Sequence, residues 1–87
     1  MTALRILYLD QNKLTDAGVA HLEGLTGLVG LYLRDTAVTD AGLEHVKGMT
    51  RLAYLDVRNT RVTEEGVKKL REVLPKCDIK YGAAEAR

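Results

Sequence analysis

The 87-residue sequence contains no phenylalanine, no tryptophan and no serine, and it has only one cysteine and one proline. The absence of serine excludes a serine nucleophile, and the lone Cys77 cannot form a disulfide within the chain. With only two histidines beside that cysteine, a zinc-stabilised scaffold is also a poor explanation. A domain of this size must therefore be held together by an aliphatic core of leucine and valine.

Neither sign of charge dominates, because 13 lysines and arginines are balanced by 12 aspartates and glutamates, for a net charge of +1. The sequence has no basic stripe of the kind that binds phosphates, so we expect no nucleic acid and no membrane among its partners. The longest uncharged stretch, residues 24–33, is too short to span a bilayer and wrongly placed for a signal sequence. These absences, together with the single cysteine, favour a cytoplasmic location.

The sequence is a tandem array of 24-residue blocks, covering residues 4–27, 28–51 and 52–75. The first two blocks are identical at 11 of 24 positions and the last two at seven, without any gap. Leu7 and Leu9 alternate with the period of a strand, whereas Val19, Leu22 and Leu25 have the spacing of one helical stripe. Each block is therefore predicted to be a short strand followed by a short helix, stacked in parallel on its neighbours.

A threonine followed by an acidic residue marks the start of each predicted helix. The threonine hydroxyl can accept a hydrogen bond from the first turn, and the acid lies where the helix dipole favours a negative charge. These pairs are Thr15–Asp16, Thr39–Asp40 and Thr63–Glu64. The third helix is predicted to run further than the others, until Pro75 stops it.

The pattern L-x-x-L-x-L-x-x-N/T-x-L, repeated three times in phase, resembles the leucine-rich repeat family. The V-T-D-A-G-L segment at residues 38–43 is similar to the 24-residue repeats of bacterial members. This resemblance implies one domain over residues 1–87 with an α/β fold, namely a right-handed parallel α/β solenoid of three strand–helix repeats. A C-terminal capping strand at 76–81 ends the solenoid, and a tail follows at 82–87. The resemblance also implies a structural ladder in which one side chain per repeat bonds the backbone of the adjacent repeat: Asn12, Thr36 and Thr60.

The strand residues between the inward leucines should point outward on the concave face of the sheet. Tyrosine and arginine are enriched there, as they are at protein interfaces. We therefore predict a site that binds a protein or peptide, formed by Tyr8, Asp10, Tyr32, Arg34, Tyr54, Asp56 and Arg58. Tyr8 and Tyr32 should lie side by side, with a shallow notch above Gly30. Alternatively, Asp10 with Arg34 and Asp56 with Lys80 form a solvated, self-paired sheet surface.

Catalysis has little support in the sequence, so we expect neither an enzyme nor a bound cofactor. His21 and His45 share one helical position in successive repeats, but Lys69 replaces the third ligand that a metal site would need. Two other classes stay open: a module whose catalytic domain lies elsewhere, and a scaffold or a truncated or engineered repeat unit. The scaffold would self-associate, as a homodimer, through an uncapped N-terminal edge. That edge consists of Leu4, Leu7, Leu9 and Leu14.

Overall fold

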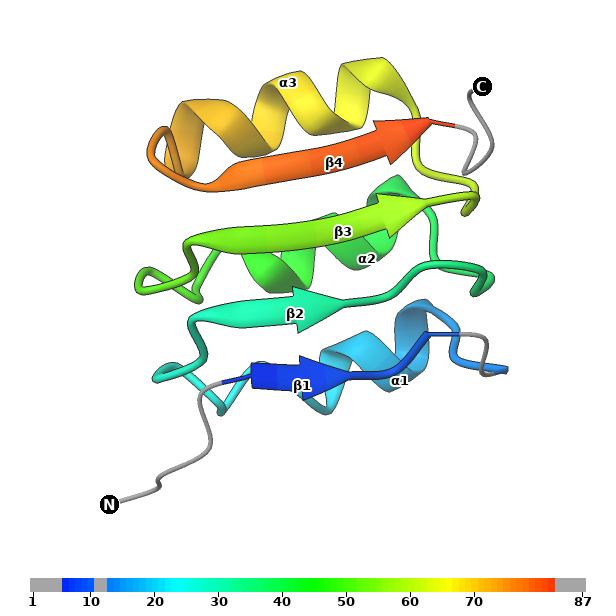
Figure 1. Cartoon of the computed structure of the whole chain (residues 1–87), viewed down its shortest axis with the longest axis horizontal. Helices are drawn as coiled ribbons and strands as arrows, with labels where there is room; N and C mark the ends of the chain where they lie inside the picture. The colour runs from blue at the N-terminus through cyan, green and yellow to red at the C-terminus, as the bar shows by residue number, and fades with distance from the viewer. Residues whose placement is uncertain (1–5, 11–12, 83–87) are drawn as a thin grey trace.

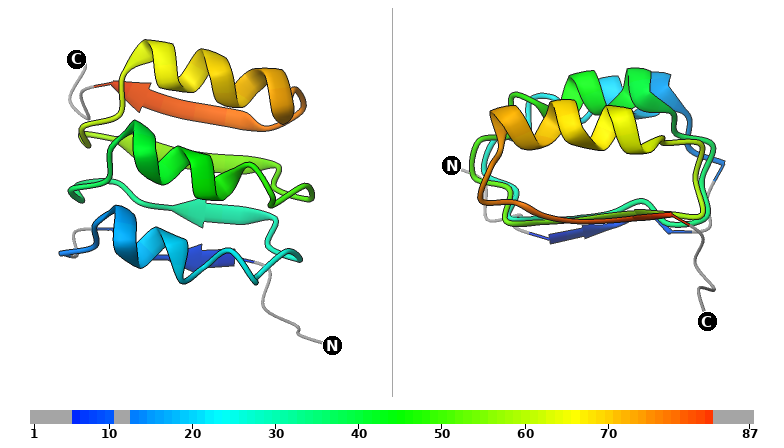
Figure 2. Two further views of the ribbon diagram at one scale, coloured as in Figure 1. Left: turned by 180° about the vertical axis from the view of Figure 1, so that it is seen from behind. Right: turned by 90° about the horizontal axis from the view of Figure 1, so that it is seen from above.

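A computed structural model describes residues 6–10 and 13–82, and within them the chain forms four strands and three helices in strict alternation. In chain order these elements are β1 (Ile6–Tyr8), α1 (Asp16–Ala20), β2 (Gly30–Tyr32), α2 (Asp40–Val46), β3 (Tyr54–Arg58), α3 (Glu64–Val73) and β4 (Asp78–Gly82). The strands form one parallel sheet in the order β1-β2-β3-β4 (Figure 1), and all three helices pack on the same face of it (Figure 2). The predicted parallel α/β solenoid is confirmed.

Each strand pairs with the residues 24 positions further along the chain. Leu7 pairs with Leu31, Leu31 with Leu55 and Leu55 with Ile79. The capping strand expected at 76–81 is observed as β4 at Asp78–Gly82, so Gly82, which was predicted to begin the tail, belongs to the strand. Its φ of 102° is a value that glycine adopts easily. Of the other predicted positions, Leu4, Asn12 and residues 83–87 of the tail lie outside the described residues.

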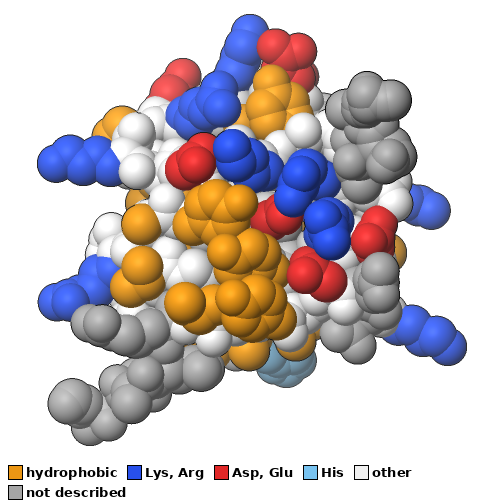
Figure 3. Space-filling model, in the orientation of Figure 1, with side chains coloured by type: hydrophobic (Ala, Val, Ile, Leu, Met, Phe, Trp, Pro, Cys, Tyr) orange, Lys and Arg blue, Asp and Glu red, His pale blue; other side chains and the backbone are white. Residues whose placement is uncertain are grey.

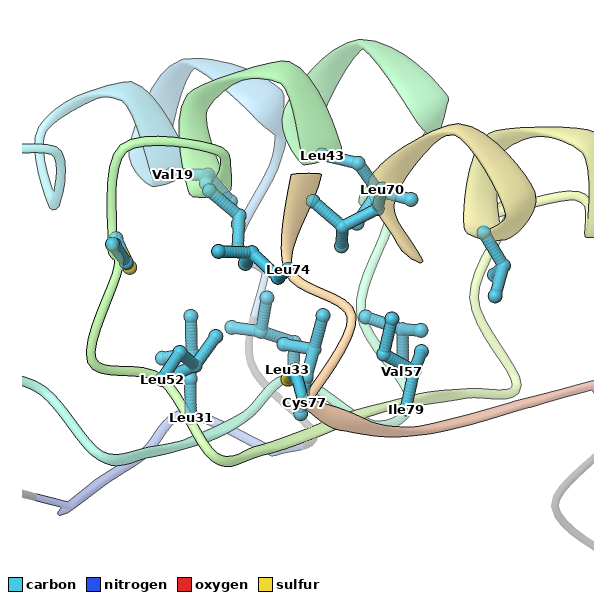
Figure 4. Close-up of a cluster of buried hydrophobic side chains, with 14 of the residues drawn as sticks. Val19, Leu31, Leu33, Leu43, Leu52, Val57, Leu70, Leu74, Cys77 and Ile79 are labelled. Carbon is cyan, nitrogen blue, oxygen red and sulfur yellow. The ribbon is translucent and has the colours of Figure 1, made fainter. Parts of the chain in front are cut away.

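The core lies between the sheet and the helices and consists of aliphatic side chains from both layers (Figure 4). Alternate strand residues point inward and meet the inward stripe of each helix, as the periodicity predicted. The side chains with no exposed surface are Val19, Leu28, Leu31, Leu33, Val38, Val46, Met49, Leu55, Val67 and Leu70. Most of the corresponding positions of the first repeat, occupied by Leu7, Leu9, Leu14 and Leu22, are only partly buried.

The threonines at positions 15, 39 and 63 are the N-cap residues of the three helices, as predicted. Thr39 Oγ1 accepts a hydrogen bond from the Ala41 amide at 3.1 Å, and Thr63 Oγ1 accepts one from the Gly66 amide at 3.2 Å. Thr15, in contrast, makes no side-chain hydrogen bond to its own helix. The two later repeats therefore have the more completely capped helices.

The predicted threonine ladder between repeats is wrong for both described members. Thr36 Oγ1 donates to the Leu33 carbonyl at 2.7 Å, and Thr60 Oγ1 donates to the Val57 carbonyl at 2.7 Å, in each case three residues back in the same repeat. The threonine side chain is shorter than that of asparagine, and it satisfies a carbonyl at the end of its own strand. These residues therefore close turns and do not join repeats.

Successive repeats are joined instead by an aspartate from the start of one helix and the N-cap threonine of the next. Asp16 accepts from the Thr39 amide at 2.7 Å through Oδ1 and from Thr39 Oγ1 at 2.5 Å through Oδ2. Asp40 accepts from the Thr63 amide at 2.8 Å and from Thr63 Oγ1 at 2.6 Å in the same way. We call each of these pairs an Asp–Thr bridge. The sequence pattern predicted only a helix-dipole role for these aspartates and did not indicate this contact.

Glycine makes room for each Asp–Thr bridge. A Cβ atom added at Gly42 would lie 2.5 Å from Asp16 Oδ1, and one added at Gly66 would collide with the Asp40 carboxylate. Both glycines are buried three residues after the threonine of the bridge. The recurring T-x-x-G spacing therefore marks the place where a carboxylate from the preceding repeat approaches the helix backbone.

Candidate functional site

One face of the sheet lies opposite the helix layer (Figure 2), and we call it the open face. Figure 3 views this face and shows an apolar patch over β1, β2 and the beginning of β3, with a cluster of basic and acidic side chains beside it. The predicted site residues all belong to β1, β2, β3 or the residues just after these strands. The parallel register therefore brings residues far apart in sequence to one surface.

The apolar part is a row of three tyrosines, Tyr8, Tyr32 and Tyr54, which we call the tyrosine strip. Tyr8 and Tyr32 pair in the sheet register, as predicted, and their rings stack with centroids 4.5 Å apart and an interplanar angle of 11°. The rings of Tyr32 and Tyr54 are 5.1 Å apart and tilted by 49°. Tyr8 remains 63% exposed and the neighbouring Ile6 47% exposed. The strip therefore offers a preordered aromatic surface to solvent.

Crowding within the strip changes the acidity of its central member. Desolvation, and then the neighbouring Tyr8 and Tyr54 phenols, raise the pKa of Tyr32 above its ordinary value. The Tyr32 hydroxyl is protonated at neutral pH, as an ordinary tyrosine is, and is able to donate a hydrogen bond.

The notch predicted above Gly30 is narrow, because the glycine is buried, yet a Cβ atom would fit there in ordinary van der Waals contact with its neighbours. Gly30 is buried, and a Cβ atom added to it would lie 3.5 Å from Ile6 Cγ1 and 3.7 Å from Tyr32 Cε1. Ile6 of β1 and Tyr32 of the same strand therefore flank the glycine. The apolar patch is consequently interrupted at Gly30 only by the space of about one methyl group.

Asp56 was predicted to be an exposed contact residue, but it is buried. It is only 2% exposed, and its carboxylate accepts hydrogen bonds from the Arg58 amide at 3.1 Å, from Nε at 3.0 Å and from Nη2 at 2.8 Å. Burial by itself would raise the pKa of the Asp56 carboxyl, but these bonds outweigh it and hold the pKa below its ordinary value. Asp56 therefore orients the Arg58 guanidinium and is withdrawn from the surface.

The expected pairing of Asp56 with Lys80 is replaced by contacts along single strands. Asp56 and Lys80 are register partners, but the Asp56 carboxylate turns to Arg58, and Lys80 Nζ lies 3.8 Å from Asp78. Two hydrogen bonds from the Arg58 guanidinium hold the Asp56 carboxylate in a fixed geometry that the single charge of a lysine does not provide, which explains the choice. The self-paired sheet surface is thus only partly realised.

Asp10 and Arg34 are brought together through the main chain. The Arg34 amide donates to Asp10 Oδ1 at 2.7 Å, and this bond connects the end of β1 to the end of β2. The Arg34 guanidinium remains partly exposed, and its buried Nε lies 3.9 Å from Asp35 Oδ2, which is beyond hydrogen-bond distance. Arg34 and Arg58 therefore provide two cationic groups beside the tyrosine strip.

The other reactive side chains lie away from this surface. His45 Nδ1 contacts Glu23 Oε2, whereas His21 is exposed at the end of α1. Among the described residues, no three His, Cys, Asp or Glu side chains lie close enough to hold a metal ion. The Cys77 thiol lines a cavity of about 160 Å³ near the end of α3, where burial first and Asp78 second raise its pKa to about 11. A thiol of this pKa is protonated and unreactive at neutral pH.

Two comparisons with known proteins bear on these observations. The family model described as leucine rich repeat matches residues 2–62. No curated protein matches the chain. In the described part of the chain, no helix has the length and apolar character needed to cross a membrane.

Proposed function

The chain belongs to the leucine-rich repeat family, and from this premise we propose that it is a non-catalytic module that binds a protein or peptide on its open face. Members of the family commonly mediate protein binding. The observation that carries the proposal for this chain is the tyrosine strip, an aromatic surface in which Tyr8 is largely exposed and Tyr32 and Tyr54 are partly exposed. Large preordered aromatic side chains lose little conformational entropy when they bind a partner, which makes them frequent anchors of interfaces.

Within this proposal the apolar and the charged parts of the open face have different roles. The tyrosine strip and Ile6 contact apolar side chains of the partner. Arg34 and Arg58 contact its carbonyl or carboxylate oxygens, and Asp56 holds the Arg58 guanidinium in place for that contact. Asp10 acts on the main chain of Arg34. The surface spans three neighbouring strands, so its width of about 15 Å suits a peptide segment better than a large flat protein surface.

The test compares a face variant with a matched control in peptide selection. The face variant carries Tyr8→Ala, Tyr32→Ala and Arg34→Ala, and the control carries Glu65→Ala, Lys68→Ala and Lys69→Ala, all exposed on α3. Peptides are selected from a random displayed library with the unmodified chain, and their affinities are then measured for all three proteins. We expect at least about tenfold weaker binding to the face variant and unchanged binding to the control. Equal affinity for both variants, with intact circular dichroism, would refute the proposal.

A second candidate function is a scaffold unit that self-associates through the N-terminal edge. It is favoured by the incomplete burial of Leu7, Leu9 and Leu14. The corresponding residues of the second repeat are fully buried. Sedimentation measures it directly: a strict monomer at tens of micromolar excludes the scaffold. The finer proposal that the repeats are of the bacterial type rests on the V-T-D-A-G-L segment at residues 38–43.

A further inference from the structure

The first repeat presents the same apolar side that the later repeats bury against a preceding neighbour. Leu7, Leu9, Leu14, Leu22 and Leu25 are partly buried. Each has a counterpart 24 residues later with no exposed surface, namely Leu31, Leu33, Val38, Val46 and Met49. The difference arises because the first repeat covers the second, whereas within the described residues nothing equivalent covers the first. We call this surface the leading face.

A polar group on the leading face repeats the same asymmetry. Thr39 and Thr63 each receive a carboxylate from the repeat before them, through both the amide and the hydroxyl. Thr15 occupies the corresponding position of the first repeat and is exposed. Among the described residues, neither its amide nor its hydroxyl has a hydrogen-bond acceptor. The leading face thus combines an apolar surface with two donors in the geometry that the chain uses twice internally.

We propose that the leading face binds a strand–helix repeat of the same 24-residue kind, stacked in register, whose aspartate accepts hydrogen bonds from the Thr15 amide and hydroxyl. The two internal interfaces specify this occupant, because each is made by the same positions and completed by one Asp–Thr bridge. The inference is independent of partner binding at the open face, since the two surfaces share no anchor residue.

A second copy of the chain fits the leading face less well. Contact between two leading faces would bury leucines but would leave both copies of Thr15 without a carboxylate. The carboxylates of Asp16 and Asp40 already form bridges in their own chain. The third repeat has Glu64 at that position, but β4 already occupies the next place in the sheet. The scaffold candidate and this proposal therefore compete for the same residues.

Docking also requires one side chain to move. A Cβ atom added at Gly18 would collide with Leu14 Cδ1, whereas at Gly42 and Gly66 the nearest atom belongs to the bridging aspartate. Leu14 thus fills space beside Gly18 that corresponds to the site of a bridging carboxylate. Valine stands at this position in the other two repeats, as Val38 and Val62. The variant Leu14→Val should therefore bind an added repeat more tightly than the unmodified face.

The test adds a repeat in frame. Residues 28–48 are copied in front of Met1, so that residues 1–3 take the places of 49–51 and the 24-residue period continues. The added aspartate then corresponds to Asp40, and a control extension carries alanine there. Amide hydrogen exchange is measured at Thr15, with Thr39 as the internal reference for a bridged threonine. We expect at least about tenfold slower exchange at Thr15 in the aspartate extension than in the original chain, and much less slowing in the alanine control.

A second measurement keeps the proposal open to refutation if the exchange rates are difficult to resolve. In the original chain Thr39→Val should lower the midpoint of urea unfolding clearly more than Thr15→Val, because Thr39 forms a bridge to Asp16 and a cap hydrogen bond with the Ala41 amide, whereas Thr15 forms neither. In the extended chain this difference should become smaller, because Thr15 then forms a bridge as well. The proposal is overturned if Thr15 exchanges equally in both extensions, if the added repeat stays unfolded, or if Thr15 in the original chain becomes protected as protein concentration rises, which would identify a second copy as the occupant.

Discussion

The two edges of the sheet end the same repeat pattern in different ways. At the N-terminal edge Leu7 and Leu9 are partly buried and α1 has five residues. At the C-terminal edge the single strand β4 covers the third repeat, Ile79 is almost fully buried and α3 has ten residues. A complete repeat is therefore not needed to cover an edge, because one strand and a lengthened helix bury the adjacent leucines.

The largest effect that the comparison predicts is at the inward leucines. Leu31→Ala should lower the free energy of unfolding by about 3 kcal/mol, because Leu31 has no exposed surface and its removal leaves a cavity. Leu7→Ala, at the paired position of β1, should cost only about 1 kcal/mol because that side chain is partly exposed. Urea unfolding of both variants measures the difference. Equal losses would mean that the leading face is as well packed as the middle of the stack.

The next effect concerns the glycines that admit the bridging carboxylates. Gly42→Ala should destabilise the chain by about 2 kcal/mol, since its methyl group would press on Asp16 and on Val38. Gly18→Ala meets only the mobile end of Leu14 and gains helix propensity, so it should be close to neutral. Thermal unfolding distinguishes the two. A Gly18 variant as unstable as the Gly42 variant would show that the first helix is held as tightly as the second.

A smaller effect separates the bridging acid from its counterpart in the last helix. Asp40→Ala removes both acceptors of an Asp–Thr bridge and should cost about 1–2 kcal/mol. Glu64→Ala is the matched control, because Glu64 also follows an N-cap threonine, but the Glu64 side chain is exposed. Its loss should cost only the dipole contribution of about 0.3–0.5 kcal/mol. If chemical denaturation gives the same loss for both, the bridge contributes nothing beyond the helix dipole.

The fold was predictable because a 24-residue period fixes the position of every inward side chain once one strand and one helix are recognised. The placement of residues on the open face was predictable for the same reason, and the side-by-side position of Tyr8 and Tyr32 follows from register alone, although their stacking does not. Side-chain choice among several partners was not predictable. Thr36 and Asp56 each form hydrogen bonds with a residue no more than three positions away, and the repeat pattern does not reveal these local partners.

The Asp–Thr bridges show a different limit. The spacing T-D-x-G was visible in two repeats, but when one helix is considered alone the helix dipole already accounts for the aspartate. Only the stacking distance between repeats shows that the Asp16 carboxylate reaches Thr39, 23 residues further along the chain. A glycine that recurs at a helical position, where it costs stability relative to alanine, was the available signal that something approaches closely.

The smallest predicted effect tests what stabilises the C-terminal edge. The Arg71 guanidinium carbon lies 5.8 Å from the centre of the Tyr81 ring, so the last turns of α3 contact the end of β4 through a cation–π pair. Arg71→Ala should lower the free energy of unfolding by about 0.5–1 kcal/mol, whereas Lys68→Ala, an exposed change on the same helix, should have almost no effect. Arg71→Lys should lower the free energy of unfolding less than Arg71→Ala does, because lysine keeps the positive charge but not the planar guanidinium. If Arg71→Ala is as silent as Lys68→Ala in urea unfolding, then pairing with β3 and the burial of Ile79 and Cys77 hold β4 in place without the cation–π pair, and the contrast between the two edges is one of apolar area.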